Sequence, residues 1–400
     1  NFAYTYTEED MKHRPHDDFT SGYWWIELGG KEQNIIHDGE YLRDELLKTV
    51  YGIWDHIKNG GNHGADNYQL EWVGMLPGKR ESRRLLGDYV LTENDLINNN
   101  TFSDAVAYGG WKIDCHVIDG FLSSEHEPTK YIHLNDVYQI PYSCLISKNI
   151  KNLFLGGRAF STTHLAFAST RVMATCGVVG QAIGTAAAIC KKYGISPRDV
   201  KEKINELQQT LLRDDCYIPG IFNTDGNDKA RSAKITASSE KQNGKAENVI
   251  NGVARSVGEN TNCYISDGFS PDGEWLLLDF CKPCEINELH IKFDSNLSQE
   301  LTISMSQWVQ SRQSRHLPSS LVKDFDVIFT NGEKEVKRIC ITDNFLRFNK
   351  FNTDGIVCDK IKISENTAKI TIPGVKIPWR LFDKETGKAI ADVITLNTER

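Results

Sequence analysis

Hydrophobic positions recur with helical spacing in several stretches of the first half of the chain. Residues 39–58 place one broad apolar face along a helix, which a glycine pair ends. Small and apolar residues dominate 170–190 and predict a second, longer helix, and Ser196-Pro197 opens a third amphipathic stretch. Thr92-Glu-Asn-Asp95 has the spacing of a capping box, which predicts a further helix start.

Alternating hydrophobicity predicts strands at 68–74, 138–145 and 152–155, and beyond about residue 230 it replaces helical spacing altogether. The strand-like runs of this second part are short and separated by turns, at 234–238, 275–280, 286–293, 301–305, 325–329, 336–341 and 358–363. Such spacing is typical of a β-sandwich. We therefore predict an α+β chain in which a mixed domain, 1–230, is followed by an all-β jelly-roll sandwich, 231–400.

Composition excludes some classes of partner. The chain has 400 residues and a net charge of −8, and no basic block stands out, so we do not expect a nucleic-acid partner. Its longest apolar run, 172–189, is interrupted by polar residues, and we interpret it as a buried helix rather than a membrane span. Among ten cysteines, Cys281 and Cys284 form a Cys-x-x-Cys without a second pair. Structural thiols or an incidental disulfide are favoured there over redox or metal chemistry.

The residues from 152 to 190 predict a strand, a glycine turn, a polar loop and a helix in that order. This order points backbone N–H groups and the positive end of a helix at an electron-rich group, such as a reduced flavin. We expect the helix to begin at Ser169–Thr170, and Gly156-Gly157 to let the backbone approach the ligand closely. A helix with so many small residues also predicts a parallel sheet beside it.

Several polar side chains are candidates for chemistry. His164 could accept or donate a proton from the loop before the helix, or serve as a structural loop histidine. Asp114 and His116 lie on one side of an extended segment and form either an acid–base pair or a satisfied hydrogen-bonded pair. A third group could bind an anion or form an ion-paired surface, and its members are Arg80, Arg83 and Arg84. Trp24, Trp25 and Trp111 could stack on a sugar or fill a core.

Motifs through about residue 230 resemble those of the FAD-dependent oxidoreductases of the two-dinucleotide-binding-domain class. They are Gly22-Tyr-Trp-Trp-Ile-Glu, Tyr51-Gly-Ile-Trp-Asp-His-Ile-Lys, Gly78-Lys-Arg-Glu-Ser-Arg-Arg-Leu-Leu-Gly-Asp-Tyr, Ala107-Tyr-Gly-Gly-Trp and the run from 152 to 188. The resemblance implies FAD and hydride transfer from a small substrate to the flavin. It also implies that the cofactor would contact Gly156, Gly157, Arg158, Ser169, Thr170, Arg171 and Val172.

The Gly-x-Gly-x-x-Gly fingerprint that holds the FAD pyrophosphate in that class is not found in this sequence. Because the sequence also starts at Asn1, we expect a fragment or processed form that lacks the adenine-side half of the cofactor site. Strand 152–155 and helix 170–190 should then expose apolar surface unless another element covers it, so we expect either chain association or an unusual internal packing.

The second part, 231–400, resembles a discoidin-type, galactose-binding-like module. The resemblance is carried by Ala233-Lys-Ile-Thr-Ala-Ser-Ser, Ala246-Glu-Asn-Val-Ile-Asn-Gly, Asn262-Cys-Tyr and Trp275-Leu-Leu-Leu-Asp-Phe. It implies either a glycan-binding module, with 260–267 as the candidate loop, or a spacer that binds nothing. It also implies a periplasmic or secreted bacterial protein. Two functions follow from the sequence. One is an oxidoreductase acting on a small carbohydrate or polyol, and the other is a non-catalytic carbohydrate- or surface-binding protein that has lost FAD.

Overall fold

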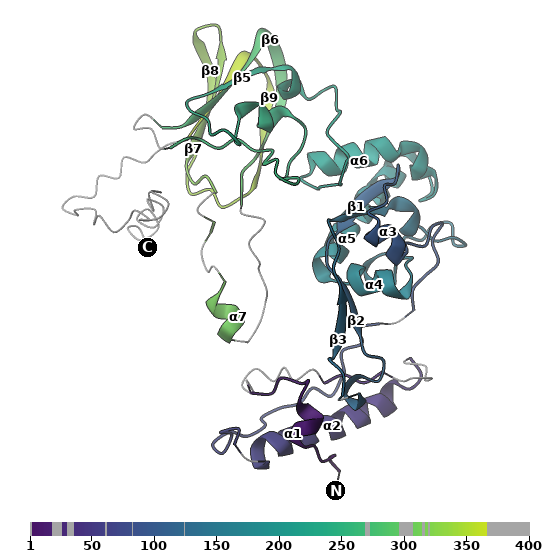
Figure 1. Cartoon of the computed structure of the whole chain (residues 1–400). Coiled ribbons are helices and arrows are strands. Elements are labelled where there is room, and N and C mark those ends of the chain that lie inside the picture. Colours follow the sequence, from purple (N-terminus) through teal and green to yellow (C-terminus); the bar gives the residue numbers. More distant parts are fainter. Residues whose placement is uncertain are drawn as a thin grey trace, which may run out of the picture. The chain divides into compact units, whose positions relative to one another are not determined.

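The computed structural model describes residues 2–17, 26–29, 36–60, 62–81, 83–123, 125–268, 273–295, 307–313, 317–318 and 321–365 (Figure 1). Contacts divide the chain into two compact units, Asn1–Ile221 with Ile303–Ser311, and Phe222–Thr302 with Arg312–Arg400. The first unit contains helices and short strands, and the second contains a sheet. This confirms the α+β class with an all-β C-terminal part, whereas the domain boundary at 230/231 stays a prediction.

The elements of the first unit are short apart from two helices. In order they are α1 (Glu8–Met11), α2 (Gly39–Asn59), α3 (Glu93–Ile97), β1 (Ala105–Gly109), β2 (Ile113–His116), η1 (Gly120–Leu122), β3 (Thr129–Ile132), β4 (Tyr138–Pro141), η2 (Tyr142–Cys144), η3 (Gly157–Ala159), α4 (His164–Thr170), α5 (Met173–Tyr193), η4 (Asp199–Lys203), α6 (Ile204–Arg213) and α7 (Gln307–Ser311). Antiparallel pairing joins β1 to β4 and β2 to β3. The helix expected at 39–58 is confirmed as α2, and Gly60 caps its C-terminus.

The main core of this unit lies where α5 packs against β1 and α6. One face of α5 is buried there, through Thr175, Val179, Ala182, Ala186 and Ile189. Fully buried aromatic side chains from β4 and η2, Tyr138 and Tyr142, belong to the same cluster. The α5 helix is therefore anchored to the core along one face.

The other face of α5 is exposed, as the sequence predicted for a helix missing its neighbour. Met173 is 86% exposed, and a Cβ added at Gly177, Gly180 or Gly184 would meet nothing within 4 Å. The interpretation of α5 as a buried helix is wrong for this face. The parallel sheet expected beside it is also absent from the described residues, whose paired strands are antiparallel. By length and composition α5 is the one described helix that could cross a membrane, a test that core helices also pass.

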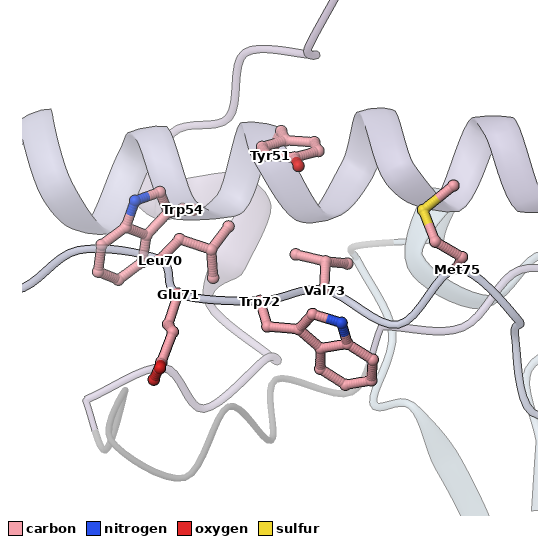
Figure 2. A pocket seen from close by; sticks show the side chains of 7 residues that line it. All are labelled: Tyr51, Trp54, Leu70, Glu71, Trp72, Val73 and Met75. Atoms are coloured by element: carbon pink, nitrogen blue, oxygen red, sulfur yellow. The ribbon is translucent and has the colours of Figure 1, made fainter.

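Two strands predicted in the first unit do not form. The segment 68–74 runs beside α2 without pairing to a strand, and Trp72 is 79% exposed. Leu70 and Val73 point toward α2, where Tyr51 and Trp54 complete an apolar groove of about 500 Å³ (Figure 2). Contact with a helix thus replaces the pairing that a strand would need.

The run 152–155 makes only one antiparallel bridge, from Phe154 to Ile146. A strand is defined by repeated pairing with a neighbour, which the described residues do not supply here. The strand expected at 138–145 ends early, at Pro141, because the chain then turns into η2. The first correction therefore arises from a missing partner and the second from the turn that follows Pro141.

The capping box at the start of α3 is confirmed. The Thr92 hydroxyl accepts a hydrogen bond from the Asp95 amide at 3.3 Å, and the Asp95 carboxylate accepts one from the Thr92 amide at 2.8 Å. We expect Thr92→Ala to lower the free energy of unfolding by about 1 kcal/mol, the usual cost of losing a cap. Urea denaturation would measure this change, and an unchanged midpoint would show that the cap contributes nothing.

The second unit is built on one described five-stranded antiparallel sheet with the order β5-β6-β9-β7-β8. Its strands are β5 (Lys234–Ala237), β6 (Trp275–Lys292), β7 (Phe325–Asn331), β8 (Lys334–Ile341) and β9 (Phe348–Glu365), and the short helices η5 (Lys229–Ser232) and η6 (Ala246–Ile250) accompany them. Phe325, Val327 and Phe329 are fully buried on β7. These strands confirm the expected runs near 234, 325, 336 and 358, whereas 301–305 lies outside the described residues.

The two strands predicted at 275–280 and 286–293 are one long strand, β6. A register shift between Asp279 and Cys284 and a positive φ of 61° at Cys281 mark a bulge where a turn was expected. A bulge keeps the strand paired on both sides while it bends. All ten cysteines are free thiols, so Cys281 and Cys284 form no disulfide in this structure.

Candidate functional site

The long helix does not begin at the predicted residues. Ser169 and Thr170 are the last two residues of α4, and α5 begins at Met173 with Val172 as its N-cap. The extended backbone at Val172, with φ −67° and ψ 147°, separates the two helices. His164 is accordingly the first residue of α4 and not part of a loop. The expected helix start at Ser169–Thr170 is therefore wrong.

The buried Ser169 has a structural use instead. Its hydroxyl lies 2.8 Å from the Tyr138 hydroxyl and donates to the Trp111 carbonyl. These contacts tie α4 to β4 and to the segment that leads into β2. Ser169 and Thr170 are 0% and 1% exposed, so neither side chain can reach a cofactor from these positions.

The glycine turn is open and is anchored by its arginine. Gly157 has a φ of 58°, which L side chains rarely adopt, and a Cβ added there would meet nothing within 4 Å. Gly156 is extended, with φ −139°. The exposed Arg158 donates hydrogen bonds from Nη1 to the carbonyls of Lys79 and Arg80, the latter at 2.9 Å. The turn is thus tied to the segment that carries the predicted arginine cluster.

His116, on β2, lies among three charged side chains. Its Nδ1 is 2.5 Å from Glu27 Oε1, and its Nε2 is 2.9 Å from Arg80 Nη2 and 3.4 Å from Asp114 Oδ2. Arg80 also lies 3.2 Å from the Glu27 carboxylate. A guanidinium can only donate and a carboxylate can only accept. The two shortest contacts therefore favour Nε2 as the acceptor from Arg80 and Nδ1–H as the donor to Glu27, over the 3.4 Å contacts of Arg80 Nη1 with Nδ1 and of Nε2 with Asp114. A carboxylate that holds Nδ1–H orients the ring and makes Nε2 the basic nitrogen.

Asp114 is held from the other side by Arg171, the residue that caps α4. Arg171 Nη2 donates to the Asp114 carbonyl at 3.0 Å and lies 3.6 Å from Oδ2. The two side chains are 12% and 13% exposed. Burial, together with the nearby Arg80, lowers the pKa of Arg171. Asp114 Oδ1 is buried and has no hydrogen-bond partner in the described part of the chain.

A second set of charged side chains, around His164, meets the His116 set at the ring of Phe167. His164 Nδ1 lies 2.8 Å from Glu81 Oε1, and Arg84 forms an ion pair with the same carboxylate. The guanidinium groups of Arg84 and Arg171 lie 5.4 and 5.8 Å from the centre of the Phe167 ring. Arg83 is exposed and forms no ion pair with the residues that the structure describes. Of the three predicted arginines, Arg80 and Arg84 therefore join the cluster.

We call this cluster the polar network, and it consists of Glu27, Arg80, Glu81, Arg84, Asp114, His116, His164 and Arg171. Sequence reasoning gave no role to Glu27 and Glu81. Both lie in motifs that carry the family resemblance, Gly22–Glu27 and Gly78–Tyr89, and this was the available signal. Trp111 is 45% exposed, whereas Trp24 and Trp25 lie outside the described residues.

The hydrogen bond that His164 donates to the Glu81 carboxylate raises the pKa of His164 above its usual 6.5. A raised folded-state pKa contributes stability that is fully present below the unfolded-state pKa and is lost as the pH rises through the folded-state value. We expect Glu81→Gln to return the His164 pKa toward 6.5 and to remove this pH dependence. NMR titration of the His164 ring would measure the change. An identical titration in both proteins would show that the contact is not made in solution.

The groove along α2 contains none of the network residues. Its lining is mostly apolar, with Glu71 as its one charged member. Acid–base chemistry needs titratable groups within hydrogen-bond reach of each other, which the polar network provides. We therefore place the candidate site at the polar network rather than at the groove.

Comparison with known families decides the class of the first unit. The family described as "FAD dependent oxidoreductase" matches residues 4–211, more than half of the chain. This chain belongs to the FAD dependent oxidoreductase family. The matched range includes the glycine turn and every residue of the polar network. No curated protein matches the sequence.

Solved structures similar to the C-terminal region are carbohydrate-binding modules. A Streptococcus pneumoniae fucose binding module, SpX-3, is 16% identical, with 34% of this chain and 84% of that chain covered and a TM-score of 0.26. The lectin domain of lectinolysin, complexed with Lewis B antigen, is 18% identical, with 36% and 89% covered and a TM-score of 0.27. Chitosan-binding module 2 of a Paenibacillus sp. IK-5 chitosanase/glucanase is 10% identical, with 34% and 86% covered and a TM-score of 0.24.

The structure fits one part of the family's cofactor. No atom lies within 4 Å of a Cβ added at Gly157, so this turn leaves its own backbone open to a ligand. The carbonyl contacts of Arg158 bring this turn to the segment whose Arg80 contacts His116. Gly156, Gly157 and Arg158 are therefore the residues that would hold the flavin side of FAD. The helix N-terminus predicted at Ser169 and Thr170 lies at Val172 instead, and Arg171 and Val172 stay predicted cofactor contacts.

Proposed function

We propose that the first unit is the flavin- and substrate-facing part of an FAD-dependent oxidoreductase that oxidises a small carbohydrate or polyol. The observation that carries this proposal is the position of His116 between the Glu27 carboxylate and the Arg80 guanidinium. Such a histidine has a fixed proton on one nitrogen and a basic lone pair on the other. It is suited to removing a proton from a substrate hydroxyl.

Bound FAD would supply the acceptor for the hydride that leaves the substrate carbon. In this proposal His116 Nε2 takes the hydroxyl proton, and Glu27 stabilises the imidazolium that results. Arg80 is 48% exposed and can turn away from Nε2 toward the substrate. Arg171 and Asp114 are nearly buried at the bottom of the site. Their contact links β2 to α4.

A sugar or polyol is supported by the residue types beside the network. Trp111 precedes β2 and exposes 45% of its surface, and an indole face suits the C–H face of a sugar ring. In the second unit, the loop 260–267 remains our candidate for glycan attachment. Asn262 in this loop has a φ of 49° and donates to the Arg255 carbonyl at 2.9 Å. Self-association through the exposed face of α5 and a periplasmic or secreted location stay predictions.

Turnover by the whole chain tests this proposal. The protein would be supplied with FAD, a dye that accepts electrons, and a panel of polyols and aldoses, with free FAD and heat-denatured protein as controls. We expect dye reduction with at least one member of the panel. Flavin binding without dye reduction would contradict oxidation of this substrate class. A chain that binds glycans but not flavin would support the alternative, a non-catalytic carbohydrate-binding protein.

A further inference from the structure

Three histidines and one glutamate converge in the first unit, at a place separate from the polar network. Glu8 lies in α1, His16 follows α1, His56 lies in the last turn of α2, and His63 follows α2. One ligand atom from each of the four side chains lies within 4.8 Å of all the others. We propose that these residues bind a divalent first-row metal ion, with Zn²⁺ as the expected ion. This proposal does not depend on the proposed oxidoreductase function.

The distances within the cluster suit a tetrahedral ion. The Nε2 atoms of His56 and His63 lie 3.3 and 2.9 Å from Glu8 Oε1, and that of His16 lies 3.4 Å from Glu8 Oε2. Ligand atoms placed tetrahedrally around Zn²⁺ at its usual bond lengths lie about 3.3 Å apart. The ring centres of the three histidines lie 4.9, 5.0 and 5.4 Å from each other, a nearly equilateral triangle. A small inward movement of the rings would complete the coordination shell.

Burial of the three rings is the second observation that points to a ligand. The side chains of His16, His56 and His63 are 9%, 6% and 8% exposed. Their Nε2 atoms are buried and have no hydrogen-bond partner among the described residues, although all three face the same carboxylate. Leaving a buried polar atom without a partner costs about 1–3 kcal/mol. A metal ion at the centre would satisfy all three atoms at once.

Hydrogen bonds outside the cluster orient one of the histidine ligands, as hydrogen bonds to the ligands do in known metal sites. His16 Nδ1 lies 2.7 Å from the Arg14 carbonyl, so this nitrogen donates and Nε2 keeps its lone pair for the centre. Arg14 is itself 1% exposed. Its guanidinium donates to the carbonyls of His126 at 2.9 Å and Gly120 at 3.1 Å. The carbonyl that orients His16 is therefore held in place by a buried arginine.

The ligand set favours zinc over other common ions. Three imidazoles and one carboxylate without a thiolate suit Zn²⁺, whereas Mg²⁺ and Ca²⁺ prefer shells made of oxygen. Four protein ligands close the coordination shell, which is typical of a structural site. The surrounding apolar cluster is small, with Met11, Ile53, Ile57, Ala65 and Phe121 as its buried members. An ion that joins α1, α2 and the following loop would reinforce this small core.

Metal titration of the whole chain tests the proposal. Protein stripped with a chelator would be titrated with Zn²⁺ in competition with a chromophoric chelator, and we expect one ion per chain. Loss of an outer-shell contact usually weakens metal binding by roughly 10- to 100-fold. The double variant His56→Gln/His63→Gln removes two ligands, so its affinity for Zn²⁺ should fall by more than this. His133→Gln is the matched control, because its side chain is exposed and lies outside both the cluster and its outer contacts. It should bind like the wild type.

Cobalt substitution keeps the test decisive if the double variant does not fold. Wild-type protein loaded with Co²⁺ should show the visible absorption of a tetrahedral ion without the near-ultraviolet band that thiolate ligands produce. A thiolate band would assign the metal to the cysteines and overturn the proposal. Failure of the stripped wild type to take up Zn²⁺, or wild-type affinity in a folded double variant, would also overturn it.

Discussion

His116→Gln is expected to reduce kcat by about 100- to 10,000-fold, the usual contribution of a general base. The variant removes the titratable Nε2 that lies 2.9 Å from Arg80, while the glutamine side chain can still hydrogen-bond with Glu27. Because the change acts on proton transfer, KM should change much less than kcat. Initial rates of dye reduction with FAD and the substrate that the wild type oxidises would measure both parameters.

His133→Gln is the control for this experiment. His133 follows β3, the strand paired with β2, and it is exposed. Its replacement should leave kcat unchanged. If His116→Gln kept wild-type kcat, the proton would be taken by another group, and His116 would be a structural residue of the polar network.

Arg171→Met is expected to lower the free energy of unfolding by about 3 kcal/mol, because it leaves a nearly buried carboxylate without its charge partner. Asp114 is 13% exposed, and Arg171 is the one arginine or lysine that pairs with its carboxylate among the described ion pairs. Methionine keeps the aliphatic bulk of the arginine side chain. The decrease in the free energy of unfolding therefore measures mainly the lost charge and the lost hydrogen bond to the Asp114 carbonyl. Urea denaturation would measure it.

A double-mutant cycle separates the ion pair from the other contacts of Arg171. In an Asp114→Asn background the carboxylate is gone, and Arg171→Met should then cost clearly less than in the wild type. Equal costs in both backgrounds would mean that the two charges are not coupled. The loss would then belong to the hydrogen bond with the Asp114 carbonyl and to packing on Phe167.

Elements whose stability is decided locally were predicted well from the sequence. The α2 helix follows from an apolar face and a terminal glycine, and the α3 capping box needs only Thr92 and Asp95. Strands 68–74 and 152–155 failed because pairing depends on a neighbour that sequence periodicity does not reveal. The break between α4 and α5 was missed because Arg171 and Val172 are also compatible with an uninterrupted helix.

The candidate site was predicted in its parts but not in its connections. His116 and Glu27 are 89 residues apart, and His164 and Glu81 are 83 apart, so no local spacing links the members of each pair. The histidine cluster was missed for the same reason. Its ligands come from two helices and two loops, whereas the Cys281–Cys284 spacing is the local metal-ligand pattern that the sequence displays. Long-range folding creates these sites, and only the structure displays them.

A flavin titration tests most directly the central claim that a flavin ring lies against Gly157, beside the polar network. Riboflavin would be titrated into the whole chain and into two variants, Gly157→Val and Gly194→Val, with flavin fluorescence as the readout. Both glycines have a positive φ, 58° and 65°, and open space around an added Cβ, but Gly194 lies at the far end of α5. The variants therefore carry similar backbone strain.

We predict that the wild type and Gly194→Val bind riboflavin with the same affinity. Gly157→Val should bind it at least about tenfold more weakly, a loss of roughly 1.4 kcal/mol. A wild-type chain that does not quench the flavin, or an equal loss in both variants, would contradict the account.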